Sequence, residues 1–243
     1  MSAEVQHDPK AARMFETFAR RQFHQRRAVQ RVRLMLTLWV IRTKINSALK
    51  RLLDISVALV ALLFAAPIMA VTALLIRLDS PGPILFRQTR VGKWGESFTC
   101  LKFRSMYIDA EERLKELQAL NEADGPVFKM KNDPRITNVG RVIRKLSIDE
   151  LPQIFNVLRG DMSLVGPRPA LPSEVAKYSF EQARRLHTIP GITGLQQVSG
   201  RSNVNFQRWV ELDLQYISEQ SVWKDIEILI KTIPAVLFSR GAY

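Results

Sequence analysis

The stretch Ile55-Ser-Val-Ala-Leu-Val-Ala-Leu-Leu-Phe-Ala-Ala-Pro-Ile-Met-Ala-Val-Thr-Ala-Leu-Leu-Ile76 decides the fold, because it holds 22 residues without a charge. A run of about 18 or more apolar residues is long enough for a membrane helix. This run begins too far from the N-terminus, and behind too much charge, to be an ordinary secretory signal. The sequence therefore predicts a membrane-associated protein.

Pro67 lies inside this run and is predicted to break the helix, because proline removes a backbone donor and bends a helix. It leaves twelve residues on one side and nine on the other. At about 1.5 Å per residue these halves reach roughly 18 and 14 Å, and both are short of a ~30 Å hydrocarbon core. Neither half alone is expected to cross a bilayer.

Basic residues flank the apolar run on both sides: Arg42, Lys44, Lys50 and Arg51 precede it, and Arg77, Arg87, Arg90 and Lys93 follow it. The positive-inside rule then places both ends in the cytoplasm. A re-entrant helix that breaks at Pro67 and returns satisfies both observations. The alternative is a tilted, kinked helix that spans the bilayer, because a spanning helix tolerates one proline. The symmetry of charge favours the re-entrant form.

The chain is predicted to have three parts: a basic N-terminal arm at residues 1–49, the membrane helix at residues 50–79, and a cytoplasmic domain at residues 80–243. Residues 1–51 hold twelve of the Lys and Arg residues against three acids, about +9 of the net +13. Such an arm can be a solvated tail, bind nucleic acid, or bind anionic lipid at roughly 1 kcal/mol per basic residue. The apolar run that follows favours lipid, so no nucleic-acid partner is expected.

The apolar patch Leu34–Ile41, which includes Trp39, is too short to span a bilayer. An interfacial helix, a core helix and a homodimer contact are all consistent with it. Cys100 is the single cysteine, which excludes an internal disulfide, and the three histidines are too far apart in sequence for a zinc motif. A site for a hard cation stays open.

Beyond the membrane helix the sequence predicts an α+β domain that is mainly helical. Residues 84–90 and 98–103 read as strands of a small β-hairpin on either side of Gly92-Lys-Trp-Gly95. Helical periodicity covers residues 105–121, and Asn132–Arg135 reads as a turn. Residues 226–238 are apolar with Lys231 and Pro234 interposed, which indicates an amphipathic helix at the membrane interface or on the core.

The stretch Ser147-Ile-Asp-Glu150 matches a capping box, in which Ser147 caps a helix and Glu150 reaches back to its amide. Pro152 fits poorly with a regular helix begun at Ser147, so the helix entry is expected to be irregular or to start at Pro152. The same acids also have a functional interpretation. An ionised carboxylate can attack phosphorus, and a neighbouring one can hold Mg²⁺ beside substrate phosphates.

Arginine suits the charge of a pyrophosphate because its donors form a fixed fork. Arg168 stands between Pro167 and Pro169, which limit its backbone freedom and favour a positioned side chain over an ordinary surface arginine. Pro190–Gly194 and Ser199–Arg201 form a second region rich in glycine, which is a weak signal for a phosphate site and is also typical of turns.

Taken together, the chain resembles the bacterial sugar transferases of the monotopic phosphoglycosyl transferase family from about residue 50 to residue 243. The matching elements are Lys50-Arg51 with Asp54, the proline-broken helix, Ser80–Pro83, Phe86–Gln88, Arg90–Gly92, Lys102–Met106, Asn132–Arg135, Asp149–Gln153, Gly160–Ser163, Gly166–Pro169, Pro190–Gly194 and Ser199–Arg201. Each motif alone is a hypothesis, but their number and order make the match specific.

The resemblance implies transfer of a sugar 1-phosphate from a UDP-sugar to undecaprenyl phosphate, a polyprenol phosphate, with release of UMP. The sugar is expected to be a hexose, glucose or galactose. The setting is the cytoplasmic face of the bacterial inner membrane, in the first membrane step of exopolysaccharide, capsule or O-antigen synthesis.

The family uses a covalent phosphosugar on the Asp of an Asp-Glu dyad, which here is Asp149. Glu150 then binds Mg²⁺ or moves a proton, and both carboxylates are candidate ligands of the Mg²⁺ cofactor. Arg144, Arg168 and Arg201 fall at positions linked to phosphate binding.

Two features depart from the family. Ala66-Pro67 stands where Ser-Pro is common, and residues 1–49 lack the multi-span region of the larger members, so the roles of that region are not carried over. The competing hypothesis is a non-catalytic, basic adaptor at the membrane surface, in which Asp149 and Glu150 serve only as acids at a helix start.

Overall fold

The structure, a computed structural model, describes residues 9–117, 121, 128, 130, 132–200 and 205–237, with side chains from residue 29 onward. The chain divides into two compact units, Met1–Ala48 and Leu49–Tyr243. In the smaller unit the side chains of the apolar patch Leu34–Ile41 are exposed. The expectation of an interfacial or dimer role for this patch stays a prediction.

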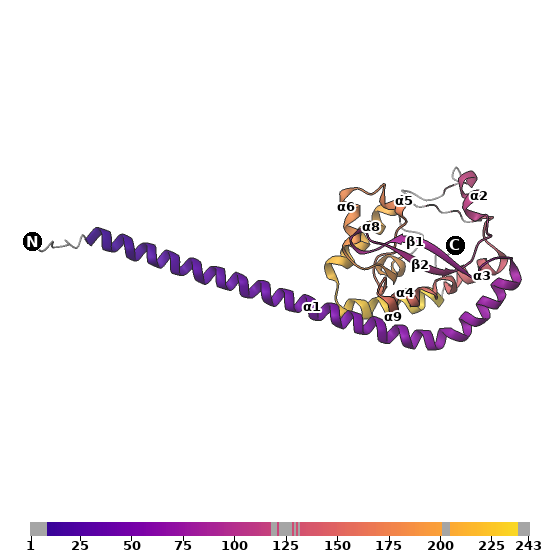
Figure 1. The fold of residues 1–243 in the computed structure, drawn as a ribbon, viewed down its shortest axis with the longest axis horizontal. Coiled ribbons are helices and arrows are strands. Elements are labelled where there is room, and N and C mark those ends of the chain that lie inside the picture. The colour runs from indigo at the N-terminus through magenta and orange to yellow at the C-terminus, as the bar shows by residue number, and fades with distance from the viewer. Residues whose placement is uncertain are drawn as a thin grey trace, which may run out of the picture. The chain divides into compact units, whose positions relative to one another are not determined.

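Helix α1 (Pro9–Asp79) contains the whole apolar run and continues through Pro67. The sequence predicted two helices separated by a break, whereas the structure has one helix, because a proline can bend a helix without ending it. In Figure 1 the part of α1 in the larger unit curves along the domain. The segment from Val29 to Asp79 is long and apolar enough to cross a membrane. The re-entrant path stays a prediction.

One face of α1 packs against the larger unit along most of the apolar run. The buried positions recur at helical spacing, and they are Asp54, Ala58, Ala65, Thr72 and Ile76. The remaining faces expose large apolar side chains, which are Leu52, Leu59, Val60, Leu63, Phe64, Ile68, Val71, Leu74, Leu75 and Leu78. The helix therefore contacts the domain through one stripe of side chains, and most of its apolar surface is exposed.

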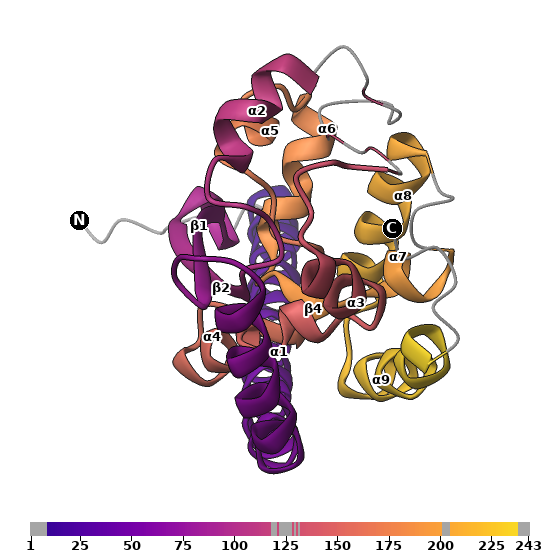
Figure 2. The same cartoon turned by 90° about the vertical axis from the view of Figure 1, so that its right-hand side faces the viewer.

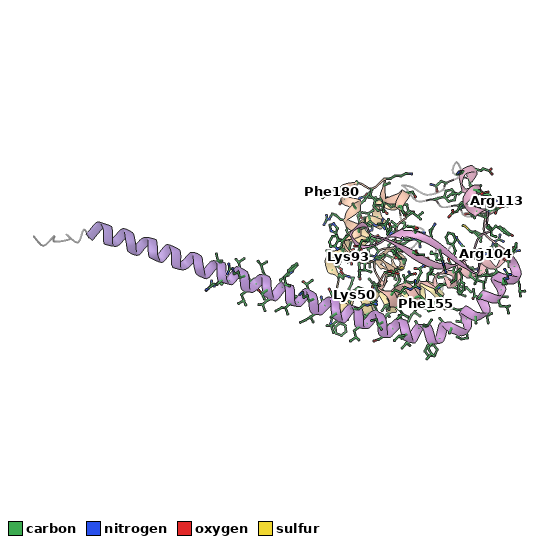
Figure 3. The ribbon with its side chains drawn as sticks, viewed as in Figure 1. Lys50, Lys93, Arg104, Arg113, Phe155 and Phe180 are labelled. Atoms are coloured by element: carbon green, nitrogen blue, oxygen red, sulfur yellow. The ribbon has the colours of Figure 1, made fainter. Side chains whose placement is uncertain are left out.

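Polar contacts fix this stripe to the domain. The Asp54 carboxylate accepts hydrogen bonds from the Ser163 hydroxyl and the Leu164 amide, both at 3.0 Å. The Lys50 ammonium lies 2.7 Å from the Asp225 carboxylate. Figure 3 shows Lys50 on α1, and Figure 2 shows α9 next to α1. These buried bonds hold the N-terminal end of the apolar run against the domain.

The predicted hairpin is confirmed. Strands β1 (Leu85–Val91) and β2 (Ser97–Phe103) pair antiparallel around the short helix η1 (Lys93–Gly95). The register places Leu85 opposite Phe103 and Arg90 opposite Phe98.

The helix predicted at residues 105–121 begins later than expected, as α2 (Ala110–Leu117). The residues just before α2 pair with another segment instead of forming a helix. Met106 forms a β-bridge with Ile136, and the Tyr107 amide donates to the Arg135 carbonyl at 2.9 Å. Residues 118–120 lie outside the described residues. The predicted turn at Asn132–Arg135 is present.

The remaining elements are α3 (Asn138–Lys145), η3 (Ile148–Glu150), α4 (Gln153–Arg159), β3 (Ser163–Val165), α5 (Pro172–Val175), α6 (Phe180–Ala183), η4 (Arg184–His187), β4 (Gly191–Thr193), α7 (Leu195–Val198), α8 (Phe206–Glu219) and α9 (Val222–Leu237). Strands β3 and β4 pair in parallel, which the sequence did not predict. The main core joins α1 to α4, β3, α8 and α9 through buried residues such as Ala58, Val157 and Ile228. The described part of the chain is α+β and mainly helical, as predicted.

Candidate active site

Ser147 connects the end of α3 to the short helix η3, which contains both acids. Its backbone is in the left-handed region, with φ at 56°, and its amide donates to the Arg144 carbonyl at 3.0 Å. The Ser147 side chain makes no capping bond, so the predicted capping box is wrong. The helix entry is irregular, as Pro152 predicted: η3 precedes α4, and Pro152 is the N-cap of α4.

Glu150 forms ion pairs with two cations instead of capping the helix. Its Oε1 lies 2.6 Å from Lys102 Nζ and 3.4 Å from Arg168 Nη1. Burial by itself raises the pKa of this carboxyl, but the charges of Lys102 and Arg168 outweigh burial and lower the pKa to about 2. Glu150 is therefore ionised, with Lys102 from β2 and Arg168 from the loop after β3 drawn toward it.

Asp149 is the more buried acid, with 8 % of its surface exposed. Burial and the charge of Glu150 raise its pKa, and the charges of Lys102, Arg144 and Arg168 lower it, which leaves the pKa at about 6. The functional interpretation of the sequence requires an ionised carboxylate at neutral pH, and this one titrates just below neutral pH. At pH 7 most of the population carries the charge, because the pH is about one unit above the pKa.

A shallow cleft, open to solvent, lies beside the dyad. Its lining residues are Arg90, Cys100, Lys102, Glu150, Gln153, Arg168, Pro169, Gly191 and Ile192. The cleft is thus lined by three cations and one carboxylate, Glu150. This excess of positive charge suits an anionic ligand that carries more than one charge. Asp149 precedes Glu150 in the chain and does not itself line this cleft.

Arg90 is a buried member of the cleft wall and fixes the Pro-Arg-Pro loop. It donates to the Pro169 carbonyl at 2.9 Å and to Gln88 Oε1 at 2.6 Å. Burial, together with the nearby charge of Arg168, lowers its pKa to about 10, so it keeps its charge at neutral pH. The Val91 amide also donates to the Ala170 carbonyl at 2.9 Å, so the hairpin holds the two residues that follow Arg168 in this loop.

The structure brings most of the predicted site residues together. Asp149, Glu150, Arg144 and Arg168 interact electrostatically, and Arg201 lies outside the described residues. The sequence did not place Lys102 or Arg90 among the predicted site residues. A signal was present: Lys102 pairs with Phe86 and Arg90 with Phe98, so the alternation of the strands places both cations on one face of the hairpin.

The dyad fits a magnesium ion that is shared with a ligand. Within the described residues no three His, Cys, Asp or Glu side chains gather as a self-sufficient metal site. Mg²⁺ is commonly held by only one or two carboxylates plus substrate phosphates, and two adjacent acids meet that need. A multiply charged anion in the cleft would supply the remaining oxygen ligands.

The chain matches known proteins over most of its length. Residues 45–239 match the family described as bacterial sugar transferase. The chain is 50% identical over 194 residues to the galactosyl transferase CpsE of Streptococcus agalactiae, covering 79% of this chain and 43% of the relative. It is 42% identical over 203 residues to the exopolysaccharide production protein ExoY of Rhizobium meliloti, covering 82% and 90%.

A third relative is the UDP-glucose:undecaprenyl-phosphate glucose-1-phosphate transferase of Caulobacter vibrioides, 42% identical over 204 residues that cover 80% of this chain and 72% of the relative. The match to the streptococcal protein spans less than half of that relative's length. The residues of this chain that match the family include the Asp149–Glu150 dyad and the loop that carries Arg168. The chain belongs to the family of bacterial sugar transferases.

Proposed function

We propose that the protein transfers a hexose 1-phosphate from a UDP-sugar to undecaprenyl phosphate and releases UMP. The observation that carries this proposal is the Asp149–Glu150 dyad beside a cleft whose wall holds Lys102 and Arg168. Relatives named as undecaprenyl-phosphate galactose phosphotransferase and as UDP-glucose:undecaprenyl-phosphate glucose-1-phosphate transferase support the choice of donor and acceptor. The place of the reaction is the first membrane step of exopolysaccharide, capsule or O-antigen synthesis.

The proposed chemistry has two displacements at the same phosphorus. An Asp149 carboxylate oxygen attacks the phosphorus that bears the sugar, the bond from that phosphorus to the bridging oxygen breaks, and UMP leaves with the electron pair. An oxygen of undecaprenyl phosphate then attacks the acyl phosphate and returns Asp149 to a carboxylate. Lys102, Arg168 and Arg90 offset the charge on the phosphate oxygens, as cations do in phosphoryl transfer.

Glu150 and Asp149 are the residues that would hold Mg²⁺ together with the phosphates of the donor. When bound, the ion would offset negative charge on the diphosphate. Glu150 has a second task, because its ion pairs with Lys102 and Arg168 hold both cations at the cleft while no donor is present.

The packing of α1 supports a re-entrant, monotopic attachment at the cytoplasmic face of the inner membrane. Asp54 and Ile76, at the two ends of the apolar run, are both buried against the domain. A helix that crossed a ~30 Å hydrocarbon core would have to release one of these contacts. Exposed apolar side chains on α3 and its C-cap, on α4 and on α9 suit helices at the interface with lipid, and they are Val142, Leu146, Phe155, Trp223, Ile230 and Ile233.

The attachment predicts that both ends of the apolar run stay inside the cell. Cysteines placed at Met35 and at Leu78, both exposed, should stay protected from a membrane-impermeant thiol reagent in intact cells. Both should react after the cells are permeabilised, which is the control for accessibility. Reaction of only one of the two in intact cells would mean that the helix spans the membrane.

The activity is tested by UMP release. The purified protein in lipid nanodiscs that contain undecaprenyl phosphate and Mg²⁺ is given a panel of UDP-sugars, and UMP is measured. Release is expected with UDP-glucose or UDP-galactose. A folded protein that releases no UMP from any donor would favour the adaptor hypothesis.

The pH dependence of the reaction follows from the raised pKa of Asp149. Only the ionised carboxylate attacks, so kcat/KM should fall as pH drops through about 6. Lys102 opposes this rise, so Lys102→Met removes a cation and should move the acid limb upward by about one pH unit. The exposed Lys115 on α2 is the control, and Lys115→Met should not change the pH at which kcat/KM falls on the acid side. An acid limb near pH 4 in the wild type would contradict the assignment.

A further inference from the structure

A second, shallow hollow that is open to solvent adjoins the catalytic cleft. Its walls are the end of the hairpin at Val91 and Gly92, the loop that carries Arg168, and the segment from Tyr178 to Pro190. Arg168 lines both this hollow and the catalytic cleft. A ligand bound beside Arg168 can therefore extend from one into the other.

This hollow offers a different chemistry from the cleft. Its arginine, Arg185, has a partner at each guanidinium nitrogen: Asp213 accepts at 2.8 and 2.7 Å, and the Tyr178 hydroxyl accepts at 2.8 Å. The Arg185 guanidinium also stacks against the rings of Tyr178 and Trp209. Because the cation is already neutralised, the hollow suits an uncharged ring better than a phosphate.

The two hollows also differ in their relation to the proposed membrane side. Next to Glu150, the residues Ile148 and Leu151 pack on Ile76 of α1. Tyr178 instead packs on Phe206, Trp209 and Val210, a cluster without residues of α1. In Figure 1, α6 lies on the side of the domain away from α1. The second hollow is thus the more distant of the two from the helix that would hold lipid.

An aromatic pair lies close in the chain to residues that line this hollow. Trp94, two residues after Gly92, is 66% exposed, and its ring centroid lies 5.1 Å from that of His187. His187 stands between Leu186 and Thr188, which both line the hollow. Trp94 also holds a left-handed backbone, with φ at 58°, which is unfavourable for a residue other than glycine and is common at functional sites. Figure 3 shows its neighbour Lys93 at the end of the domain that also carries Phe180.

We propose that the second hollow binds the pyrimidine nucleoside of the donor, with the base stacked on Trp94. The Thr188 hydroxyl, which donates to Gln220 Oε1 at 3.4 Å, then accepts a hydrogen bond from a polar edge of the nucleoside. This rests on the proposed function, which requires a place for the leaving nucleotide. In an in-line displacement the leaving group departs on the side opposite the nucleophile. The diphosphate then lies beside Arg168, with the nucleotide away from α1 and the transferred phosphosugar on the Asp149 side, where the lipid acceptor arrives.

The test measures the dissociation constant of UMP by calorimetry on the detergent-solubilised protein. Trp94→Ala is expected to weaken UMP binding roughly tenfold or more, since stacking of a base on an aromatic ring is worth about that much. Trp94→Phe should keep most of the affinity. Thr188→Val, which keeps the shape and removes the hydroxyl, should weaken binding severalfold, and Thr188→Ser should restore it. AMP should bind more weakly than UMP.

Phe180→Ala is the matched control, because Phe180 is another exposed aromatic side chain and has no part in the proposed site. In turnover, Trp94→Ala should raise KM for the UDP-sugar with little change in kcat. Unchanged UMP affinity in both Trp94→Ala and Thr188→Val, or no UMP binding by the wild type, would overturn the nucleoside site. UMP release by the wild type is scored separately, so an active enzyme with unaffected variants refutes this inference alone.

Discussion

Replacing Asp149 by asparagine is expected to reduce UMP release from a UDP-sugar by at least about 10³-fold, the scale seen when a catalytic nucleophile is removed. The amide keeps the shape of the side chain but cannot form an acyl phosphate. Because the carboxylate is 8 % exposed and next to Glu150, neither bulk water nor a distant side chain replaces it readily. The measurement is the initial rate of UMP release with undecaprenyl phosphate and Mg²⁺ present.

A folding control belongs with this variant. Burial raises the pKa of Asp149, which means that the fold disfavours its charge, so neutral asparagine should not lower the melting temperature. Asp109→Asn removes a carboxylate whose ion pair with Arg113 is exposed, and it should retain wild-type turnover. Undiminished UMP release by Asp149→Asn would rule out the covalent role of this residue.

Replacing Lys50 by methionine is expected to lower the free energy of unfolding by about 3 kcal/mol, because it leaves a buried charge without its partner. The Lys50 ammonium lies 2.7 Å from the Asp225 carboxylate and 3.0 Å from the Val165 carbonyl. Asp225 is 1% exposed, so water does not replace the lost cation. The Tyr216 hydroxyl, which also donates to Asp225 at 2.7 Å, preserves part of the interaction.

This network connects α1 to α9, so the same change should make α9 easier to cleave. Thermal unfolding and limited proteolysis in detergent measure the two effects. Lys224→Met is the matched control, since Lys224 also pairs with acids near α9 but those acids are exposed. Equal stability of the Lys50 and Lys224 variants would show that the buried pair does not anchor α1.

Local patterns predicted the parts of the fold that local forces determine. Alternating apolar residues around Gly92-Lys-Trp-Gly95 predicted the hairpin, and Pro152 predicted an irregular entry to α4. The capping box failed because Ser147 adopts a left-handed backbone and Glu150 finds stronger partners on β2 and after β3. These partners lie 48 and 18 residues away in the chain, so no local pattern identifies them.

For the membrane helix, too, the sequence predicted local features but not the contacts with distant residues. The sequence identified the apolar run and the charges that flank it, whereas the predicted break at Pro67 is absent and α1 continues through it. The stripe that packs on the domain was not predicted, because Asp54 and Thr72 are buried by contacts with the rest of the larger unit. The identity of the dyad was predicted, but the raised pKa of Asp149 depends on burial that only the tertiary structure provides.

The measurement that tests the central claim most directly is capture of the covalent intermediate. The purified protein is incubated with Mg²⁺ and a UDP-sugar labelled in the sugar, without undecaprenyl phosphate, then quenched and analysed by peptide mass spectrometry. We predict release of up to one equivalent of UMP and a retained sugar phosphate on the peptide that contains Asp149, with none in Asp149→Asn. Turnover with acceptor present, but no retained label under any quench, would contradict the account and favour direct transfer.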